Sequence, residues 1–502
     1  MRSMTTTSDP VAPVKGETRM LIDGALIEAR SGRTFDNVNP ATEEVLGPVT
    51  DADTDDMRLA IAAARRAFDE TTWSTDHKFR QHCLEQLQEA LVGEQEELRR
   101  ELVAEVGCPV LVTYGPQLDA PLEDGLLWPA RHIDEFEWEH DLPEGTAFGM
   151  RSWRKVVKEP AGVVGAIVPW NFPFEVTLQK VGQALATGNT LIVKPAPDTP
   201  WNATRLGRLI AENTDIPAGV VNVVTSSDHL VGEELVVDPR VDLISFTGST
   251  AVGRRIMEVG AATMKRLFLE LGGKSAHIVL DDADFEATLP FASFVCMHAG
   301  QGCAMLTRLL VPRSRYDEAV SIVEAGFGTI TYGDPTDPAN VQGPQISAKQ
   351  RERVLGYIDK GVAEGARLVL GGKRPAHLPK GYFVEPTLFA DVDNSMTIAQ
   401  EEIFGPVLVI IPFDDDDDAV RIANDSVYGL SGSVSSGDEA RAVSVARRIR
   451  TGTIGVNGGV FYGADAPFGG YKASGIGRQN GTEGFLQYLE SKTISGGLPA
   501  EG

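Results

Sequence analysis

Two side chains in the sequence could carry out covalent and acid–base chemistry. Cys303 lies in the segment GQGCAM, where the small neighbours Gly302 and Ala304 leave its sulfur approachable. Because a thiol has an ordinary pKa of about 8.5, it needs local help to act as a nucleophile. Glu270 ends the apolar segment LFLE, and desolvation at a strand end would raise its pKa toward that of a general base. Taken alone, Cys303 also fits a buried structural cysteine and Glu270 an ordinary strand-end carboxylate.

Three further segments could hold a substrate or a phosphate. Asn171 lies between two prolines in PWNFP, so its amide could donate to an oxyanion, although an Asx turn is the alternative. Gly248 and Ser249 follow the apolar run DLISF and precede an expected helix, whose N-terminus favours phosphate. This GST-x-x-G segment does not match the full G-x-G-x-x-G dinucleotide pattern and is a weak motif on its own. Lys194 ends another apolar run, TLIVK, at a position suited to a cofactor hydroxyl or phosphate.

A parallel sheet is the element that would bring these residues together. From residue 161 to 281, short apolar runs alternate with helical segments, which is the pattern of a parallel sheet covered by helices. A second α/β stretch is expected from 283 to 470. We expect strands at 20–26, 163–170, 190–195, 220–224, 242–248, 266–271, 276–280 and 485–496, helices at 57–68, 77–106, 201–214 and 347–364, and a hairpin at 139–160.

The charge balance narrows the range of partners. The 502 residues include 71 acidic and 46 basic side chains, for a formal net charge of −25. So acidic a chain repels phosphate backbones, and we therefore expect no nucleic-acid partner and no anionic membrane surface. No apolar run approaches the roughly 20 residues of a membrane helix. Five consecutive acids, 414–418, are interpreted as the capped start of a helix rather than a calcium loop.

The cysteine pattern and the first residues indicate the compartment. The four cysteines are too few for a disulfide framework and lack Cys-x-x-Cys spacing, so we expect a reducing, cytoplasmic compartment and no metal site. Residues 1–16 have no apolar stretch that could act as a signal, and we expect a short disordered lead-in there.

Taken together, the motifs occur in the order and spacing of one family. They are PWNFP, VKP, FTGST-x-x-G, ELGGKS, GQGC, EEIFGPV and PFGGYKASGIGR. From residue 39 to the C-terminal strand, the chain closely resembles the NAD(P)-dependent aldehyde dehydrogenase superfamily. The resemblance implies an α/β fold with a Rossmann-type parallel-sheet cofactor domain, an α/β catalytic domain and a small β bridging domain for oligomerisation. The implied boundaries are 1–138 with 160–271 for dinucleotide binding, 272–472 for catalysis, and 139–159 with 485–496 for bridging.

The resemblance also implies a mechanism. Cys303 would attack the aldehyde carbon to form a thiohemiacetal, with the oxyanion held by the Asn171 side chain and the Cys303 backbone N–H. Transfer of a hydride to the nicotinamide would leave a thioester, and Glu270 would activate the water that hydrolyses it to the carboxylic acid. Lys180 matches the lysine that lies on a proton path from the general base in many members.

For the cofactor, the resemblance implies six contact residues: Trp170, Lys194, Gly248, Ser249, Glu402 and Phe404. NAD is the expected cofactor. Pro197 stands where NAD-preferring members commonly have a ribose-binding glutamate, so NADP stays open, and Asp198 is a hypothetical substitute. Gln479 stands where many members have a glutamate that supports the general base, which could slow hydrolysis of the thioester.

The substrate and the assembly are less closely specified. Phe172, Val176, Tyr462 and Phe468 match pocket positions and indicate an apolar or aromatic wall, so a medium-sized aliphatic or aromatic aldehyde is expected. Glu175 also matches a pocket position. Exposed strand edges favour a homodimer or homotetramer. Three alternatives are a CoA-acylating semialdehyde dehydrogenase, an acyl-group reductase and a catalytically inactive relative.

Overall fold

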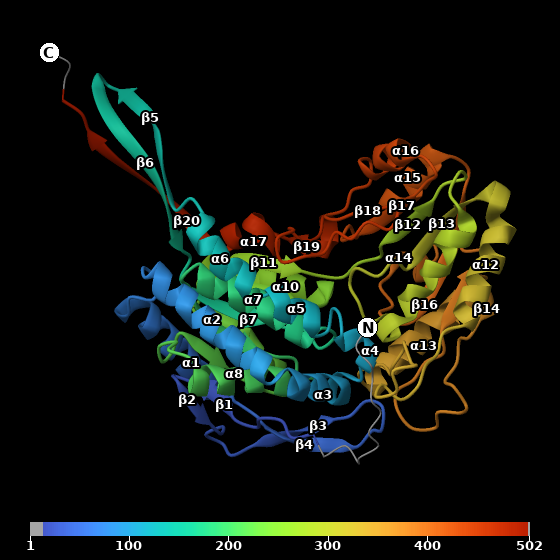
Figure 1. The fold of residues 1–502 in the computed structure, drawn as a ribbon, viewed down its shortest axis with the longest axis horizontal. Helices are drawn as coiled ribbons and strands as arrows, with labels where there is room; N and C mark the ends of the chain where they lie inside the picture. Colours follow the sequence, from blue (N-terminus) through green and yellow to red (C-terminus); the bar gives the residue numbers. More distant parts are fainter. Residues whose placement is uncertain (1–13, 500–502) are drawn as a thin grey trace.

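The computed structural model describes residues 14–499. Residues 1–13, which make up most of the expected lead-in, lie outside the described residues. Two α/β units lie side by side, and a narrow three-stranded sheet projects from one of them (Figure 1). None of the helices in the described part of the chain is long and apolar enough to cross a membrane.

The first unit is built on an eight-stranded sheet in the order β19-β11-β10-β7-β8-β9-β1-β2. The five strands from β11 to β9 are parallel. The strands are β1 (Met20–Ile22), β2 (Ala25–Ile27), β7 (Val163–Ile167), β8 (Thr190–Lys194), β9 (Val221–Val223), β10 (Leu243–Thr247), β11 (Arg266–Glu270) and β19 (Gly475–Ile476). The covering helices are α1 (Thr54–Glu70), α2 (His77–Gly93), α3 (Gln95–Val106), α4 (Val110–Thr113), α5 (Asp119–Asp124), α6 (Leu127–Glu135), α7 (Pro173–Ala186), α8 (Trp201–Asn213), α9 (His229–Val237) and α10 (Thr250–Gly260).

Alternation along the strands divides the core of this unit into two layers. Val164 and Leu191 pack with α2, α3, α7 and α8, whereas their neighbours Val163 and Ile192 pack with α1, α9 and α10. Successive side chains of a strand point to opposite faces, so a strand covered on both faces must be apolar throughout. This is why these strands appear in the sequence as continuous apolar runs.

The second unit is built on a seven-stranded sheet in the order β14-β15-β16-β13-β12-β17-β18, parallel except for β14. Its strands are β12 (Ala276–Val279), β13 (Arg308–Pro312), β14 (Arg367–Leu370), β15 (Thr387–Ala390), β16 (Val407–Phe413), β17 (Gly432–Ser435) and β18 (Gly455–Val456). Its helices are α11 (Phe285–Thr288), α12 (Tyr316–Gly328), α13 (Ala348–Ala363), α14 (Thr397–Gln400), α15 (Asp416–Asn424) and α16 (Glu439–Ala446). The acidic run caps α15 as expected, since the Asp415 side chain accepts from the Asp418 backbone N–H.

The projecting sheet joins distant segments of the chain. β5 (Glu139–Ala147) and β6 (Met150–Pro160) form the expected hairpin, and β20 (Leu489–Gly497) pairs antiparallel with β6 along its length. A separate short hairpin joins β3 (Thr34–Val38) to β4 (Val45–Thr50). The bridging and other domain boundaries drawn from the resemblance stay a prediction.

Three of the expected elements differ in detail. The strand expected at 485–496 begins only at Leu489, because residues 485–487 end helix α17 (Gly481–Gln487). The strand expected at 20–26 is a tight hairpin, since Asp23 and Gly24 both have positive φ angles that suit a two-residue turn. The helix expected at 77–106 is divided at Glu94, whose backbone leaves the helical region. In the last two cases a local turn interrupts an apolar pattern that continues through it.

Candidate active site

The carboxyl ends of four parallel strands place the predicted residues at one edge of the first sheet. Lys194 is the last residue of β8 and Glu270 the last of β11, while Gly248 directly follows β10 and Asn171 lies in the loop after β7. Thr247 of β10 pairs with Glu270 of β11, so these strands end level. Ligands of open α/β sheets bind at this edge.

The second unit supplies the sulfur that faces this edge. Cys303 lies in the loop between the 3₁₀ segment Leu289–Gly300 and β13. Its Sγ atom lies 3.8 Å from Glu270 Oε1, within hydrogen-bonding distance for a sulfur donor. The glycines after Glu270 make this approach possible, because a Cβ at Gly273 would lie 2.4 Å from the Cys303 carbonyl oxygen.

Burial governs the protonation of this pair. Burial raises the pKa of the Cys303 thiol well above its ordinary value, and the negative charge of Glu270 raises it further. Burial also raises the pKa of Glu270, an effect opposed by the positive charge of Lys180. The sulfur is therefore held as a thiol, and Glu270 is the acceptor to which its proton can pass.

A buried clamp fixes Asn171. The side-chain Nδ2 donates to the Gln301 backbone carbonyl oxygen at 2.8 Å. The backbone carbonyl oxygen of Asn171 accepts from Gln117 Nε2 at 2.7 Å and from His298 Nε2 at 2.9 Å. Burial lowers the pKa of His298 to about 4, so the ring is neutral and its Nε2 carries the proton. An amide nitrogen has two protons, and Nδ2 thus retains one for a substrate oxygen.

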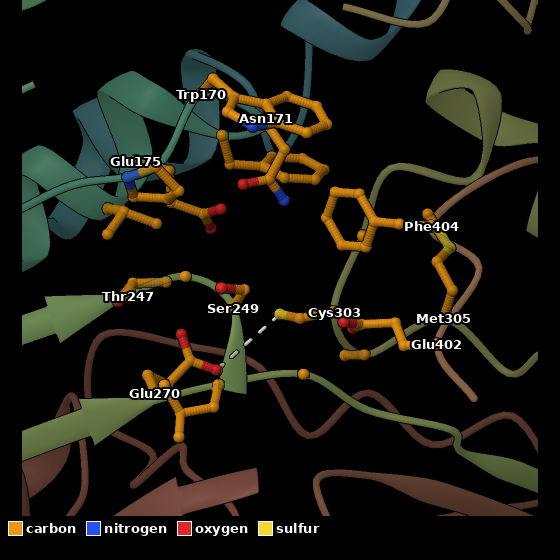
Figure 2. Close-up of a pocket in the computed structure, with 18 of the residues that line it drawn as sticks. Trp170, Asn171, Glu175, Thr247, Ser249, Glu270, Cys303, Met305, Glu402 and Phe404 are labelled. Atoms are coloured by element: carbon orange, nitrogen blue, oxygen red, sulfur yellow. Dashed lines mark hydrogen bonds between the residues drawn. The ribbon is translucent and has the colours of Figure 1, made fainter. Parts of the chain in front are cut away.

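Most of the predicted residues line one pocket of about 510 Å³ (Figure 2). They are Trp170, Asn171, Phe172, Val176, Gly248, Ser249, Glu270, Cys303, Glu402, Phe404, Tyr462 and Phe468. Lys180 and Lys194 are buried and are not among the lining residues. Among residues 14–499, no three His, Cys, Asp or Glu side chains gather so that they could hold a metal ion.

Lys180 is held in the interior beneath Glu270. Its Nζ donates to Ser245 Oγ at 2.9 Å and lies 4.7 Å from the centre of the Phe268 ring. Burial lowers its pKa, while the charge of Glu270 acts in the opposite direction. Gln479, the departure noted in the sequence, donates to the Gln179 carbonyl oxygen and to Gln183 Oε1.

The other end of the pocket has the donors and acceptors that a dinucleotide needs. Glu402 Oε1 accepts the Gly273 N–H at 2.9 Å, and the Trp170 and Phe404 rings meet edge to face at 5.3 Å. Helix α10 begins here, and Ser249 caps its N-terminus. Lys194 Nζ donates to two carbonyl oxygens, each at 3.1 Å, which leaves one of its three protons for a ligand. A helix N-terminus suits phosphates and a lysine suits ribose hydroxyls, so these residues fit an adenine dinucleotide.

Comparison with known proteins identifies the family. The model of the aldehyde dehydrogenase family matches residues 26–494. The chain belongs to the aldehyde dehydrogenase family. A 3-succinoylsemialdehyde-pyridine dehydrogenase from Pseudomonas sp. is 43% identical over 95% of this chain and 98% of its own length. A geranial dehydrogenase from Castellaniella defragrans is 42% identical over the same shares of both chains.

The fold comparison agrees with this assignment. The crystal structure of a Mycobacterium tuberculosis aldehyde dehydrogenase complexed with NAD⁺ superimposes with a TM-score of 0.90 at 43% identity, covering 95% of this chain and 97% of that one. The aldehyde dehydrogenase resemblance and the α/β fold class predicted from the sequence are therefore confirmed. The protein is an NAD(P)-dependent oxidoreductase that acts on aldehydes.

The sequence did not indicate the residues that position Asn171. Gln117 lies in a loop after α4, and His298 precedes the cysteine loop in a left-handed conformation, with φ of 50°. Neither belongs to a motif, and both bond to the backbone of Asn171 rather than to its side chain. A partial signal existed for His298, because the run HAGQG is rich in residues that tolerate positive φ.

Proposed function

We propose that this aldehyde dehydrogenase oxidises an aldehyde to the carboxylic acid with NAD⁺, through a thioester on Cys303 that water hydrolyses. The observation that carries the proposal is the 3.8 Å approach of the Cys303 thiol to Glu270, beside Asn171 in one pocket. A nucleophile, a proton acceptor and an oxyanion donor around one space are the components of acyl chemistry.

In the first half-reaction, Glu270 accepts the thiol proton and Cys303 Sγ forms a bond to the carbonyl carbon. The remaining Nδ2 proton of Asn171 and the Cys303 backbone N–H stabilise the oxygen that becomes negative. Because Gln301, Gln117 and His298 hold Asn171 in place, no reorganisation of this donor is needed during the reaction.

When bound, NAD⁺ accepts the hydride that leaves the substrate carbon. Trp170, Glu402, Phe404, Lys194 and the N-terminus of α10 at Ser249 would hold it. Between the half-reactions Glu270 releases the thiol proton to solvent. In the second half-reaction, Glu270 takes a proton from water, the water oxygen bonds to the thioester carbon, the carbon–sulfur bond breaks, and the proton on Glu270 returns to the Cys303 thiolate. Lys180 lies beneath Glu270, where its charge favours the ionised carboxylate.

The surroundings of Lys194 support a preference for NAD over NADP. Burial lowers the pKa of Lys194 to about 8, and the charges of Asp198, Asp51 and Asp228 act in the opposite direction. Three carboxylates around the lysine create a negative potential where a 2′-phosphate would bind, and juxtaposed like charges oppose binding. Asp198 would thus supply the negative charge that Pro197 cannot supply.

This proposal is tested by following reduced nicotinamide with a panel of aldehydes, each cofactor in turn, and no CoA. We expect turnover with NAD⁺ and a kcat/KM at least about tenfold lower with NADP⁺, because of the like-charge cost. Turnover only after CoA is added would show that a thiol, not water, resolves the thioester.

The variant Asp198→Asn removes the negative charge of this side chain while keeping its size. It should lower the ratio of kcat/KM for NAD⁺ to that for NADP⁺, whereas Asp465→Asn, in the loop between β18 and β19, should leave the ratio unchanged. A natural preference for NADP⁺, or an unchanged ratio in Asp198→Asn, would contradict the cofactor assignment.

We also propose that the protein is a homo-oligomer of the reducing cytoplasm. Phe148 is 99% exposed at the tip of the projecting hairpin, and Met150 and Trp153 are exposed beside it, which favours contact with a second copy. All four cysteines are unpaired. Sedimentation should give a dimer or tetramer that Trp153→Lys weakens, whereas a monomeric mass for the unchanged protein would contradict this.

A further inference from the structure

A buried carboxyl lies at the substrate end of the pocket. Glu175, the third residue of α7, is only 7% exposed and lines the same pocket as Cys303 and Asn171. Figure 2 shows it extending into the space that Asn171, Cys303 and Glu270 face. The reaction described above gives this carboxyl no task.

Its position in the helix does not account for its orientation. An acid in the first turn commonly stabilises the helix dipole or bonds to the backbone N–H of the N-cap residue. The N-cap here is Phe172, which forms no side-chain cap, and the group that favours the ionised form of Glu175 is the hydroxyl of Tyr462. Tyr462 lies in the loop between β18 and β19, where its hydroxyl contacts Gln179 of α7.

The hydrogen bond from Gln179 to Tyr462 leaves Glu175 able to act as an acceptor. Gln179 Nε2 donates to Tyr462 Oη at 2.6 Å. A phenol has one proton, and because its oxygen already accepts from Gln179, that proton is available to Glu175. A carboxylate accepts several hydrogen bonds, so Glu175 retains acceptor capacity for a group in the pocket.

No positive charge compensates this carboxyl within the described residues. The groups that act on Glu175 are Tyr462 and Glu270, and Glu175 in turn acts on Cys303. Burial raises the pKa of Glu175 to about 8, and the charge of Glu270 adds to this rise. Two cations do line the pocket, Lys349 and Arg353, but Arg353 donates to the Glu402 carbonyl oxygen at the cofactor end.

We propose that Glu175 selects aldehydes that carry a protonated amine, with the ammonium group on its carboxylate and the carbonyl carbon at Cys303. The inference rests on the proposed aldehyde oxidation. A desolvated carboxylate without a cation is costly, and a cationic substrate relieves that cost through charge-assisted hydrogen bonds. The rings of Phe172, Tyr462 and Phe468 line the pocket, and aromatic faces attract cations.

The test compares aldehydes of similar size that differ in their distal group. These are 3-aminopropanal, 3-hydroxypropanal, butanal and succinic semialdehyde, each with saturating NAD⁺. We expect kcat/KM to fall in that order, with 3-aminopropanal exceeding butanal by roughly tenfold or more, as for hydrogen bonds to charged groups. In Glu175→Gln, which keeps the size of the side chain and its capacity to accept from Tyr462, the amine-to-butanal ratio should fall to about one.

A matched control separates this role from helix stabilisation. Glu286 is an exposed glutamate in the first turn of α11, and Glu286→Gln should leave the ratio unchanged. The ratio should also depend on pH. Because the carboxylate form binds the ammonium group, the ratio should rise as Glu175 loses its proton near its pKa of about 8, while Glu175→Gln gives a flat profile.

Failure of the inference and failure of the proposed function give different results. A wild-type ratio of one or below, or a ratio that Glu175→Gln does not change, overturns the role of Glu175 while butanal oxidation still supports the dehydrogenase. If no aldehyde is oxidised, the proposed function fails. Propylammonium then tests the site directly: it should raise the melting temperature of the wild type but not of Glu175→Gln, and an equal response would overturn the inference.

Discussion

Replacing Cys303 with alanine should abolish aldehyde oxidation, lowering kcat by at least about 10⁴-fold, as loss of a nucleophile typically does. The sulfur is the atom that bonds to the substrate carbon, and no other thiol lines the pocket. Binding of NAD⁺, measured by calorimetry, should persist because the cofactor residues lie on other loops. The measurement is the steady-state rate of NADH formation.

Cys296→Ala is the matched control for this change. Cys296 lies seven residues earlier, is fully buried, and has a pKa raised by burial, so it is an inert core thiol. Its replacement should cost about 1 kcal/mol of stability and leave turnover in place. Full activity in Cys303→Ala, or loss of activity only in Cys296→Ala, would show that the nucleophile is assigned wrongly.

Replacing Glu270 with glutamine should slow hydrolysis of the thioester more than its formation. The neutral amide cannot take a proton from water, so the thioester should accumulate, and the steady-state rate should fall by roughly 10²–10⁴-fold. Rapid mixing should still show a burst of NADH close to one equivalent per site, although the burst should form more slowly because the thiol also loses its proton acceptor. A normal steady-state rate, or a slow burst followed by hydrolysis at the wild-type rate, would argue against Glu270 as the base for hydrolysis.

The pH dependence of thioester hydrolysis also tests Glu270 as the base. Glu270 acts as a base when ionised, and burial raises its pKa above the ordinary carboxyl value of about 4.3, so hydrolysis of the thioester should speed up as pH rises through the shifted pKa. Removing the charge of Lys180, as in Lys180→Met, should move this limb to higher pH, since Lys180 lowers the pKa of Glu270.

The fold could be predicted from the sequence where one force dominates. Strands β7, β8, β10 and β11 are covered on both faces, so their burial is recorded as continuous apolar runs. The turn at Asp23–Gly24 and the helix break at Glu94 were missed, because they depend on backbone angles at single residues within apolar stretches. Such interruptions change few side chains and so leave little trace in hydrophobic periodicity.

The candidate site divides in a similar way. Cys303, Glu270 and Asn171 could be singled out because each lies in a motif with a chemical reason for its residue types. The clamp on Asn171 could not, since Gln117 and His298 lie on different loops, nor could the contact between Gln179 of α7 and Tyr462 of the loop after β18. Only the folded chain brings these partners together, and a buried glutamate in a helix start has the same sequence signature as an exposed one.

The proton on Cys303 also affects how the protein withstands oxidants. Peroxides and alkylating reagents attack the thiolate, and burial beside Glu270 keeps the free sulfur in its thiol form. Air should therefore oxidise Cys303 only slowly in the resting enzyme, even though this sulfur lies in an open pocket. Chemical inactivation then requires the same proton transfer that begins turnover, so the protein is most vulnerable to sulfur-directed damage when the pocket is prepared for catalysis.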